Sequence, residues 1–422
     1  MPSTGPVPLS VLDLAPLSSG TSAADALRNT IDLARHAERF GYARYWLAEH
    51  HLTPGVASAA PAVLIALVAD ATRRIRVGSG AVQTGHHTPL VIAEQFGTIA
   101  HIHPGRIDLG LGRSSARRVG ERATGSAAGP SAGRGGTATA TAEPSVINGL
   151  LIPAPPKVMF NRENLRRQMD LVGYRDGADE DYTDQVRDIQ AFIRGEYRTP
   201  DGVHLCSPTA EGADLQLWIL AASAGDSART AGELGLPLAA NYHVVPSTVL
   251  DTVAAYRATF QPSETLDGQR RRDHALSAPP EAKVRGSLTA PHVMVSADVV
   301  VADDDETARQ LASGYGPWVA SIRTGDGAVP YPTPAEAAAY PWTEQSRALV
   351  ADRLDTQFVG SPETVVRRLR TLRDATGADE LLITTITHDH ADRVRSYELL
   401  AEAWARSAPV PPSAHVPDAR RP

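Results

Sequence analysis

The tripeptide Glu49-His50-His51 is the part of the sequence whose residue types most clearly suggest chemistry. It follows residues 45–48, an apolar segment of strand length, so it lies where a strand is expected to end. The carboxyl ends of parallel strands carry the reactive residues in α/β folds. Histidine has an ordinary pKa near neutral pH, so it can accept or release a proton there. The motif therefore predicts acid–base chemistry, although a lone histidine at a strand end is more often structural.

A second group of residues is suited to holding an anion. Arg113 comes directly after the apolar segment 106–112, and Ser223-Ala224-Gly225-Asp226-Ser227 follows the apolar segment 215–221. Small residues let backbone amides approach an anion, and a helix beginning near Asp226 would point its positive end there. Arginine can bind two phosphate oxygens at once. These residues predict a cofactor phosphate site, in which Asp226 adds an opposing charge unless it turns outward as a helix cap.

Other motifs carry weaker signals. Gly78-Ser79-Gly80 and Gly110-Leu111-Gly112 lack the third glycine of a dinucleotide-binding fingerprint, so we reject a Rossmann fold. His101-Ile102-His103 falls at a helix end on the face opposite the site, where capping is the expected role. His388-Asp389-His390 follows a predicted strand and is either a substrate contact or an ordinary polar loop. The lone Cys206 excludes an internal disulfide and a multi-cysteine metal site, and we expect no metal ligands.

Apolar segments of strand length alternate with segments of helical period, and together they must position these motifs. The predicted strands are residues 9–14, 45–48, 75–82, 106–112, 215–221, 238–242, 293–301 and 380–387. The predicted helices are residues 22–40, 58–72, 88–102, 182–194, 226–234, 246–260, 303–313, 364–376 and 392–405. This alternation is typical of an α/β parallel sheet, and it predicts one (β/α)8 TIM barrel over residues 1–407.

Two long insertions interrupt the alternation at the predicted C-terminal face of the barrel. Residues 114–180 begin with a stretch of Gly, Ala, Ser, Thr and Arg that cannot bury enough apolar surface to offset its ordering entropy. We predict a flexible loop or lid there, because loops of this length are usually functional or disordered. Residues 261–291 form a second polar excursion, residues 314–350 suggest a loose region, and residues 408–422 suggest a disordered tail.

The overall composition is that of a globular protein with a sizeable core. The chain has 422 residues, of which 42% are hydrophobic and 21% charged, and its formal net charge is −7. This balance disfavours nucleic acid and anionic membranes as partners. The first residues lack a signal-peptide pattern, and no apolar run reaches the ~18 residues of a membrane span, so we predict a cytoplasmic location.

The order of the motifs resembles the bacterial luciferase-like flavin-dependent monooxygenase family. The resemblance covers most of the chain outside the two insertions, and it rests on the whole set, since any one motif alone is weak. The matching segments are Leu9-Ser10-Val11-Leu12-Asp13, Tyr45-Trp46-Leu47-Ala48-Glu49-His50-His51, Arg76-Val77-Gly78-Ser79-Gly80, Ala93-Glu94-Gln95-Phe96, residues 103–113, Gly235-Leu236-Pro237 and Phe358-Val359-Gly360-Ser361-Pro362-Glu363.

This resemblance implies a monooxygenase that uses O2 and reduced FMN, the latter supplied by a separate flavin reductase. In such an enzyme a C4a-hydroperoxyflavin, shielded at the barrel mouth, passes one oxygen atom to a small organic substrate. The resemblance also implies a homodimer and a place in secondary metabolism.

The resemblance further assigns roles to individual residues. It implies that His50 is the catalytic histidine, that Glu49 orders the site and that His51 is structural. It matches the step from Gly80 to Ala81 to a non-proline cis peptide bond under the flavin ring. The residues that it assigns to the FMN phosphate are Arg113, Ser223, Ala224 and Ser227.

Three alternatives stay open from the sequence. The same family hosts hydride transfer with the deazaflavin F420, although the opening strand and the Glu49-His50-His51 motif favour FMN. A non-catalytic flavin-binding protein is the second alternative, which the presence of His50 disfavours. A metal-dependent barrel hydrolase is the third, but the first strand offers only Asp13 as a ligand for a metal.

Overall fold

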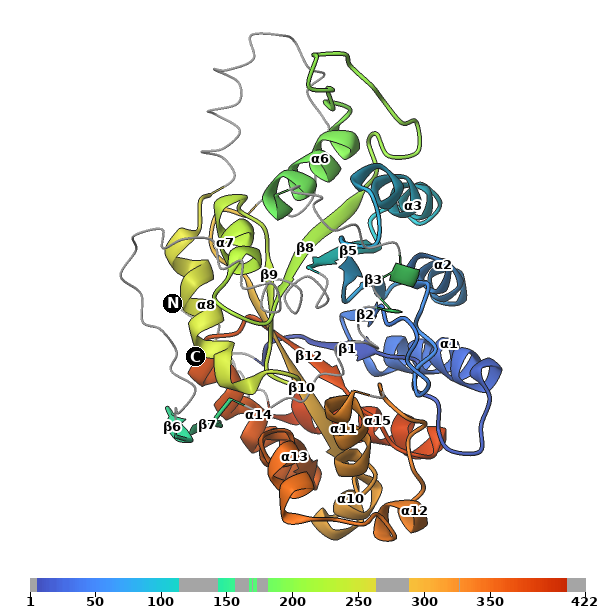
Figure 1. The fold of residues 1–422 in the computed structure, drawn as a ribbon, viewed down its shortest axis with the longest axis vertical. Helices are drawn as coiled ribbons and strands as arrows, with labels where there is room; N and C mark the ends of the chain where they lie inside the picture. The colour runs from blue at the N-terminus through green and yellow to red at the C-terminus, as the bar shows by residue number, and fades with distance from the viewer. Residues whose placement is uncertain are drawn as a thin grey trace, which may run out of the picture.

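The computed structural model describes residues 6–113, 143–155, 167–168, 170–172, 181–262, 288–325 and 327–407 (Figure 1). Most of the insertion 114–180, most of the insertion 261–291 and the tail 408–422 lie outside the described residues. The predictions of a lid and of a disordered tail therefore fall outside them too.

Within the described residues, parallel strands close into a ring, which confirms the predicted (β/α)8 barrel. The ring runs β1, β2, β3, β5, β8, β9, β10, β12 and back to β1. The third predicted strand is split into two pieces, β3 and β4, and β4 pairs with β5. The bounds are β1 Leu9–Asp13, β2 Arg44–Leu47, β3 Arg76–Ser79, β4 Val82–Gln83, β5 Ile107–Gly112, β8 Leu215–Ala221, β9 Leu238–Asn241, β10 Val293–Val301 and β12 Glu380–Thr384.

Helices surround the barrel, and local sequence sets their ends (Figure 1). Ser22 begins the first helix with a capping box, Thr88 and Ser361 cap two others, and Gly41 ends the first helix in a left-handed conformation with φ 86°. The bounds are α1 Ala23–Phe40, α2 Pro61–Ala71, α3 Pro89–Ile102, α6 Tyr182–Arg194, α7 Asp226–Glu233, η1 Pro246–Thr248, α8 Val249–Thr259, α14 Pro362–Thr376 and α15 His390–Arg406.

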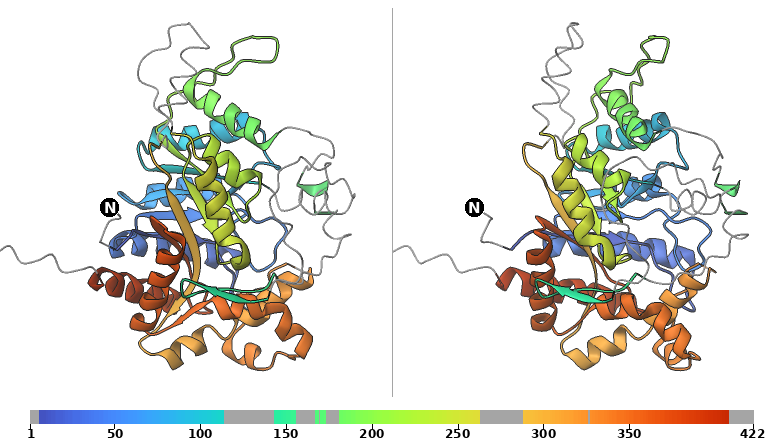
Figure 2. Two further views of the ribbon diagram at one scale, coloured as in Figure 1. Left: turned by 90° about the vertical axis from the view of Figure 1, so that its left-hand side faces the viewer. Right: turned by 60° about the vertical axis from the view of Figure 1, so that its left-hand side comes forward.

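The segment 314–350, predicted to be loose, is instead largely helical, so that prediction is wrong. These helices gather on one side of the barrel in every view (Figure 2). Tertiary packing stabilises them, since an added Cβ at Gly316 would lie 3.0 Å from the Trp342 ring. The elements between β10 and α14 are α10 Asp305–Leu311, α11 Tyr315–Thr324, α12 Pro334–Ala338, α13 Glu344–Thr356 and the short strand β11 Phe358–Gly360.

A β-hairpin lies in the part of the first insertion that the structure describes, where irregular chain was predicted. It consists of β6 Ser145–Ile147 and β7 Leu150–Ile152, and it lies beside α14 (Figure 1). Asn148 and Gly149 join the two strands with φ values of 51° and 79°. Two positive φ values in a two-residue loop define a type I′ turn, which matches the twist of the strands.

Strand alternation divides the apolar residues between two cores. Leu12, Trp46, Trp218, Met294 and Leu382 occupy even positions and form a cluster inside the barrel. Their odd-numbered neighbours belong to a larger cluster that also includes residues of the surrounding helices. The Trp46 and Trp218 rings meet edge to face with centroids 5.2 Å apart, which fills the middle of the barrel.

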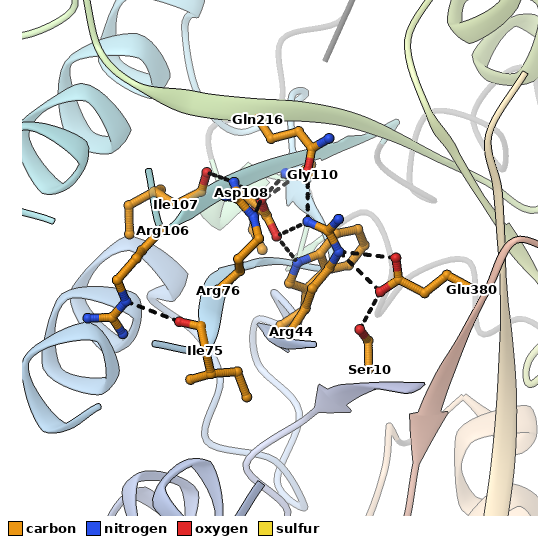
Figure 3. A network of polar contacts seen from close by, with 12 residues as sticks. Ser10, Arg44, Ile75, Arg76, Arg106, Ile107, Asp108, Gly110, Gln216 and Glu380 are labelled. Atoms are coloured by element: carbon orange, nitrogen blue, oxygen red, sulfur yellow. Dashed lines mark hydrogen bonds and ion pairs between the residues drawn. The ribbon is translucent and has the colours of Figure 1, made fainter. Parts of the chain in front are cut away.

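A charged network occupies the barrel interior at the amino ends of the strands (Figure 3). Arg44 Nη1 donates to Asp108 Oδ2 at 2.8 Å, and Arg44 Nε donates to Glu380 Oε1 at 3.1 Å. Arg76 Nη2 lies 2.5 Å from the other oxygen of Asp108, and Gln216 accepts from Arg44 at 2.8 Å. Each buried charge thus has a counter-charge, without which its desolvation would be costly. Side chains fill the barrel at the amino ends of the strands, so a ligand-binding cavity is expected at the carboxyl ends.

Candidate active site

A cavity of about 410 Å³ lies at the carboxyl ends of the strands. Its size is typical of a small-molecule or cofactor site. Small residues near the carboxyl ends of the strands, Ala48, Gly80 and Gly112, leave room for this cavity and line it. The predicted site residues that line this cavity are Glu49, His50, Gly80, Ala81, Arg113, Ser223 and Ser227, whereas Ala224 is not among its lining residues.

His50 presents an imidazole to this cavity. The loop after β2 is held in place by the His50 backbone N–H, which donates to the Ser58 carbonyl oxygen at 3.0 Å. Burial, assisted by the nearby His51, lowers the pKa of His50 to about 4, although the Glu49 carboxylate acts in the opposite direction. The buried Nδ1 atom has no hydrogen-bond partner among the described residues. Buried polar atoms without a partner are rare in folded proteins, and a catalytic role is one physical reason for keeping such an atom.

The Glu49 carboxylate contacts β4 and the loop after it. One oxygen accepts the Gln83 backbone N–H at 2.8 Å, and the other lies 2.7 Å from His51 Nε2. Burial raises the pKa of Glu49, but hydrogen bonds from the histidines around it and from the Gln83 N–H outweigh burial and lower that pKa. Glu49 therefore joins the loops after β2 and β4 as a carboxylate.

The Gly80–Ala81 peptide bond is cis, as the resemblance implied. Space around it is limited, since an added Cβ at Gly80 would lie 2.7 Å from Leu12 Cδ1. An added Cβ at Gly112 would lie 3.1 Å from Ala81 Cβ. Backbone rather than side chain therefore forms this wall of the cavity, and a flat ring could lie close against it.

Arg113 and the start of α7 form the polar end of the cavity. Arg113 Nη1 lies 2.6 Å from Asp226 Oδ2, and Arg229 Nη2 lies 2.5 Å from the other oxygen of Asp226. Gly225, not Asp226, is the N-cap residue of α7, so the idea that Asp226 acts as a cap is wrong. Its charge is instead balanced by two guanidinium groups, and half of its side chain is exposed. An anion bound here would share Arg113 with Asp226.

A second polar group at the cavity was not singled out from the sequence. His243 Nδ1 lies 2.6 Å from Ser296 Oγ, and Asp298 Oδ2 lies 3.3 Å from Arg353 Nη2. The Tyr315 hydroxyl donates to Asp298 and accepts from Arg353 Nη2 at 2.5 Å. Burial and the charges of Arg353 and His50 lower the pKa of His243 to about 3, and burial raises the pKa of Asp298 despite Arg353.

Sequence signals existed for some of these residues. His243 comes just after β9, so the strand-end rule could have found it. Asp298 is a charged residue inside the mostly apolar strand β10, which is a separate local signal. Arg353 lies on α13, beyond the end of the region predicted to be loose, and nothing local points it toward the cavity.

The remaining motifs lie away from the cavity. His388 Nε2 lies 3.1 Å from the Ser19 carbonyl oxygen, and His390 Nε2 lies 2.8 Å from Asp32 Oδ2, contacts that agree with the alternative of an ordinary polar loop. His103 is the C-cap residue of α3, in line with the expected capping role. Asp13 pairs with Arg393 at 2.7 Å and is fully buried, which removes it as a metal ligand.

Comparison with known proteins identifies the family of this chain. The sequence pattern of the luciferase-like monooxygenases matches residues 7–134 and 188–380. The chain belongs to the luciferase-like monooxygenase family. Members of this family are oxidoreductases that act on small molecules, and this membership agrees with the resemblance drawn from the sequence. Among the described residues, no helix is long and apolar enough to cross a membrane.

Similar proteins cover nearly the whole chain. Uncharacterized protein YvbT of Bacillus subtilis (strain 168) is 35% identical over 396 residues, which are 94% of this chain and 96% of that protein. A luciferase-like monooxygenase of Escherichia coli (strain K12) is 30% identical over 393 residues, which are 93% of this chain and 96% of that protein. The crystal structure of apo-MsnO8 has a TM-score of 0.68 and 28% identity, covering 96% of this chain and all of that one.

Two more distant solved structures share the fold but differ in their cofactors. The oxygenating constituent of 3,6-diketocamphane monooxygenase from Pseudomonas putida, in complex with FMN, has a TM-score of 0.56 at 19% identity and covers 96% of this chain. An F420-dependent secondary alcohol dehydrogenase has a TM-score of 0.55 at 14% identity and covers 94% of this chain. The barrel alone therefore does not choose between the two cofactors.

Proposed function

We propose that this protein is a monooxygenase that uses reduced FMN and O2 to oxygenate a small organic substrate. The observation that carries the proposal is the composition of one cavity. His50, the Gly80–Ala81 backbone and Arg113 with the start of α7 all line it. A flat ring against the backbone wall and a phosphate at the polar end would use all three features.

Each feature has a separate task in this proposal. Reduced flavin, when bound, supplies the activation of oxygen that the protein's own side chains cannot supply. Arg113, Ser223 and Ser227 hold the phosphate by charge and hydrogen bonds. His50 exchanges a proton through its imidazole, which lines the cavity. Trp318 with other apolar side chains around the mouth excludes water from the reacting centre.

Reduced FMN would come from a separate flavin reductase. The chain lacks a dinucleotide-binding fingerprint, so it offers no evident place for a nicotinamide cofactor. The purified protein is therefore expected to take up oxygen with NADH and FMN only after a flavin reductase is added. Oxygen uptake with NADH and FMN in the absence of any reductase would contradict this part of the proposal.

The role of His50 is tested by separating flavin binding from flavin reaction. The His50→Gln variant should bind reduced FMN within about threefold of the parent affinity, because the amide fills similar space. Its rate of flavin reoxidation after mixing with O2 should differ from the parent rate by about 10²-fold, the usual size of acid–base effects. His101→Gln, an exposed position at the end of α3, is the matched control. Equal reoxidation rates in His50→Gln and the parent would overturn the assignment.

A further inference from the structure

A cluster of histidines surrounds Glu49 beside the cavity, and the proposed chemistry does not use it. Its members are Glu49 and His51 from the loop after β2, and His86 and His87 from the turn between β4 and α3. We call these four residues the Glu49 cluster. The sequence separates the two pairs by more than thirty positions, so only the fold brings them together.

The distances in the Glu49 cluster are close to those of a metal coordination shell. Glu49 Oε1 lies 2.7 Å from His51 Nε2, 3.1 Å from His87 Nε2 and 3.5 Å from His86 Nδ1. The ligand atoms of Glu49, His51 and His86 all lie within 4.8 Å of one another. Ligand atoms around a tetrahedral zinc ion, at bonds of about 2.0–2.1 Å, are about 3.3–3.4 Å apart. Small side-chain movements would therefore make room for such an ion.

Three imidazoles converge on one carboxylate oxygen of Glu49. A carboxylate oxygen has two lone pairs, whereas three ring nitrogens lie within 3.5 Å of Glu49 Oε1. The other oxygen, Oε2, is already held by the Gln83 backbone N–H at 2.8 Å. Such a hydrogen bond is what orients a carboxylate ligand in known metal sites. A cation bound here would be held by the same carboxylate oxygen and ring nitrogens, with each nitrogen offering a lone pair in place of an N–H proton.

The Glu49 cluster has two buried members and two members that solvent can reach. The Glu49 side chain is fully buried and that of His86 is 7% exposed, whereas His51 and His87 are 27% and 28% exposed. An ion can therefore enter past the two outer rings, and water can complete its coordination. Imidazole nitrogens with one carboxylate favour zinc and similar transition metals over Ca²⁺ or Mg²⁺, which prefer oxygen ligands.

We propose that Glu49, His51 and His86 bind a divalent transition-metal ion of the zinc type, with His87 within reach as a fourth ligand. Sequence analysis expected no metal ligands in this chain, and the proposal replaces that expectation. The ion would tie the loop after β2 to the turn after β4 and so fix the backbone on both sides of His50. Its role is positional, and it does not depend on which cofactor the cavity binds.

Cobalt titration of the full chain tests the proposal. The protein carries Cys206→Ser, because an exposed thiol would bind metal by itself, and it is first freed of metal with a chelator. One equivalent of Co²⁺ should give visible d–d absorption bands, and Zn²⁺ should abolish them by displacement. Zn²⁺ should also raise the thermal unfolding temperature of this protein.

Variants decide whether the cluster is the site. His86→Ala and His51→Gln should each weaken Co²⁺ binding by about 100-fold or more, because each loses a direct ligand. His390→Ala is the matched control, since His390 touches Asp32 at 2.8 Å but lies outside the cluster. Circular dichroism confirms the fold of each variant, and His51→Gln, at the more exposed position, serves if His86→Ala does not fold. Absence of a saturable site, or parent-like binding by a folded His51→Gln, would overturn the proposal.

Discussion

Replacing Asp226 with asparagine should tighten the binding of FMN. The Asp226 carboxylate lies 2.6 Å from Arg113, the cation assigned to the FMN phosphate, and a bound phosphate would have to share that cation. The Arg113 side chain is 16% exposed and the Asp226 side chain 54% exposed, so the pair is partly screened by water. Asparagine keeps the size of the side chain and removes the competing charge.

The expected gain follows from that exposure. A partly exposed ion pair contributes about 0.2–1 kcal/mol. Two like charges about 4 Å apart repel by ~1 kcal/mol at the dielectric constant of water. Relief of both effects gives about 1–2 kcal/mol, or roughly 5- to 30-fold tighter binding. Arg113→Ala should act in the opposite sense, because the loss of charge-assisted hydrogen bonds costs about 1.5–3 kcal/mol, or roughly 10- to 150-fold.

The assay compares FMN with riboflavin, which has the same ring system and no phosphate. Dissociation constants come from the quenching of flavin fluorescence at low ionic strength. Both substitutions should change FMN affinity and leave riboflavin affinity within about twofold. Asp184→Asn, at an exposed carboxylate that pairs with Arg187 at 2.9 Å, controls for the change in net charge. Equal weakening of FMN and riboflavin by Arg113→Ala, or weaker FMN binding by Asp226→Asn, would refute the phosphate assignment.

Two further predictions concern the barrel. Asp13→Asn should lower the free energy of unfolding by about 3–5 kcal/mol at pH 7, because it leaves the Arg393 charge buried without a partner. The control is Asp303→Asn, which removes an exposed ion pair with Arg395 and should lower the free energy of unfolding by under ~1 kcal/mol. Burial raises the pKa of Asp13, but the charge of Arg393 together with hydrogen bonds from Tyr45, Arg393 and Thr30 outweighs burial and lowers that pKa below the unfolded value. The deficit should therefore be constant above about pH 5 and shrink as the pH falls below about 4 in urea titrations. Gly110→Ala should destabilise the protein by about 1–3 kcal/mol, because its Cβ would lie 2.1 Å from the Ser79 carbonyl oxygen, and an unchanged urea midpoint would contradict this packing.

The barrel strands were predictable because their signals are local. Each is a short apolar run followed by a turn, and strand alternation then decides which residues face inward, as at Trp46 and Trp218. Two misses also had local signals. Asn148-Gly149 between apolar residues is a hairpin signature, and Thr333 with Glu336 forms a capping box in the region predicted to be loose.

Other features could not be predicted, because they depend on distant parts of the chain. Glu49 was expected to order the site, but its contact with His87 arises only when the turn after β4 packs beside the loop after β2. The pairing of Asp298 with Arg353 joins β10 to α13 across the intervening helices. Arg113 and Asp226 were both placed at the phosphate site from the sequence, whereas the ion pair between them required the structure. Residue type and strand position thus predicted the members of the site better than their contacts.

The central claim is that the cavity binds reduced FMN and promotes its reaction with O2. Its most direct test is an anaerobic titration of the purified chain with reduced FMN and, separately, with reduced F420, followed by mixing each complex with O2. The proposal predicts saturable binding of reduced FMN, with bound flavin reoxidised at a rate distinct from that of free flavin. Tight binding of F420, with reduced FMN bound weakly and reoxidised as in free solution, would contradict it and indicate hydride transfer instead.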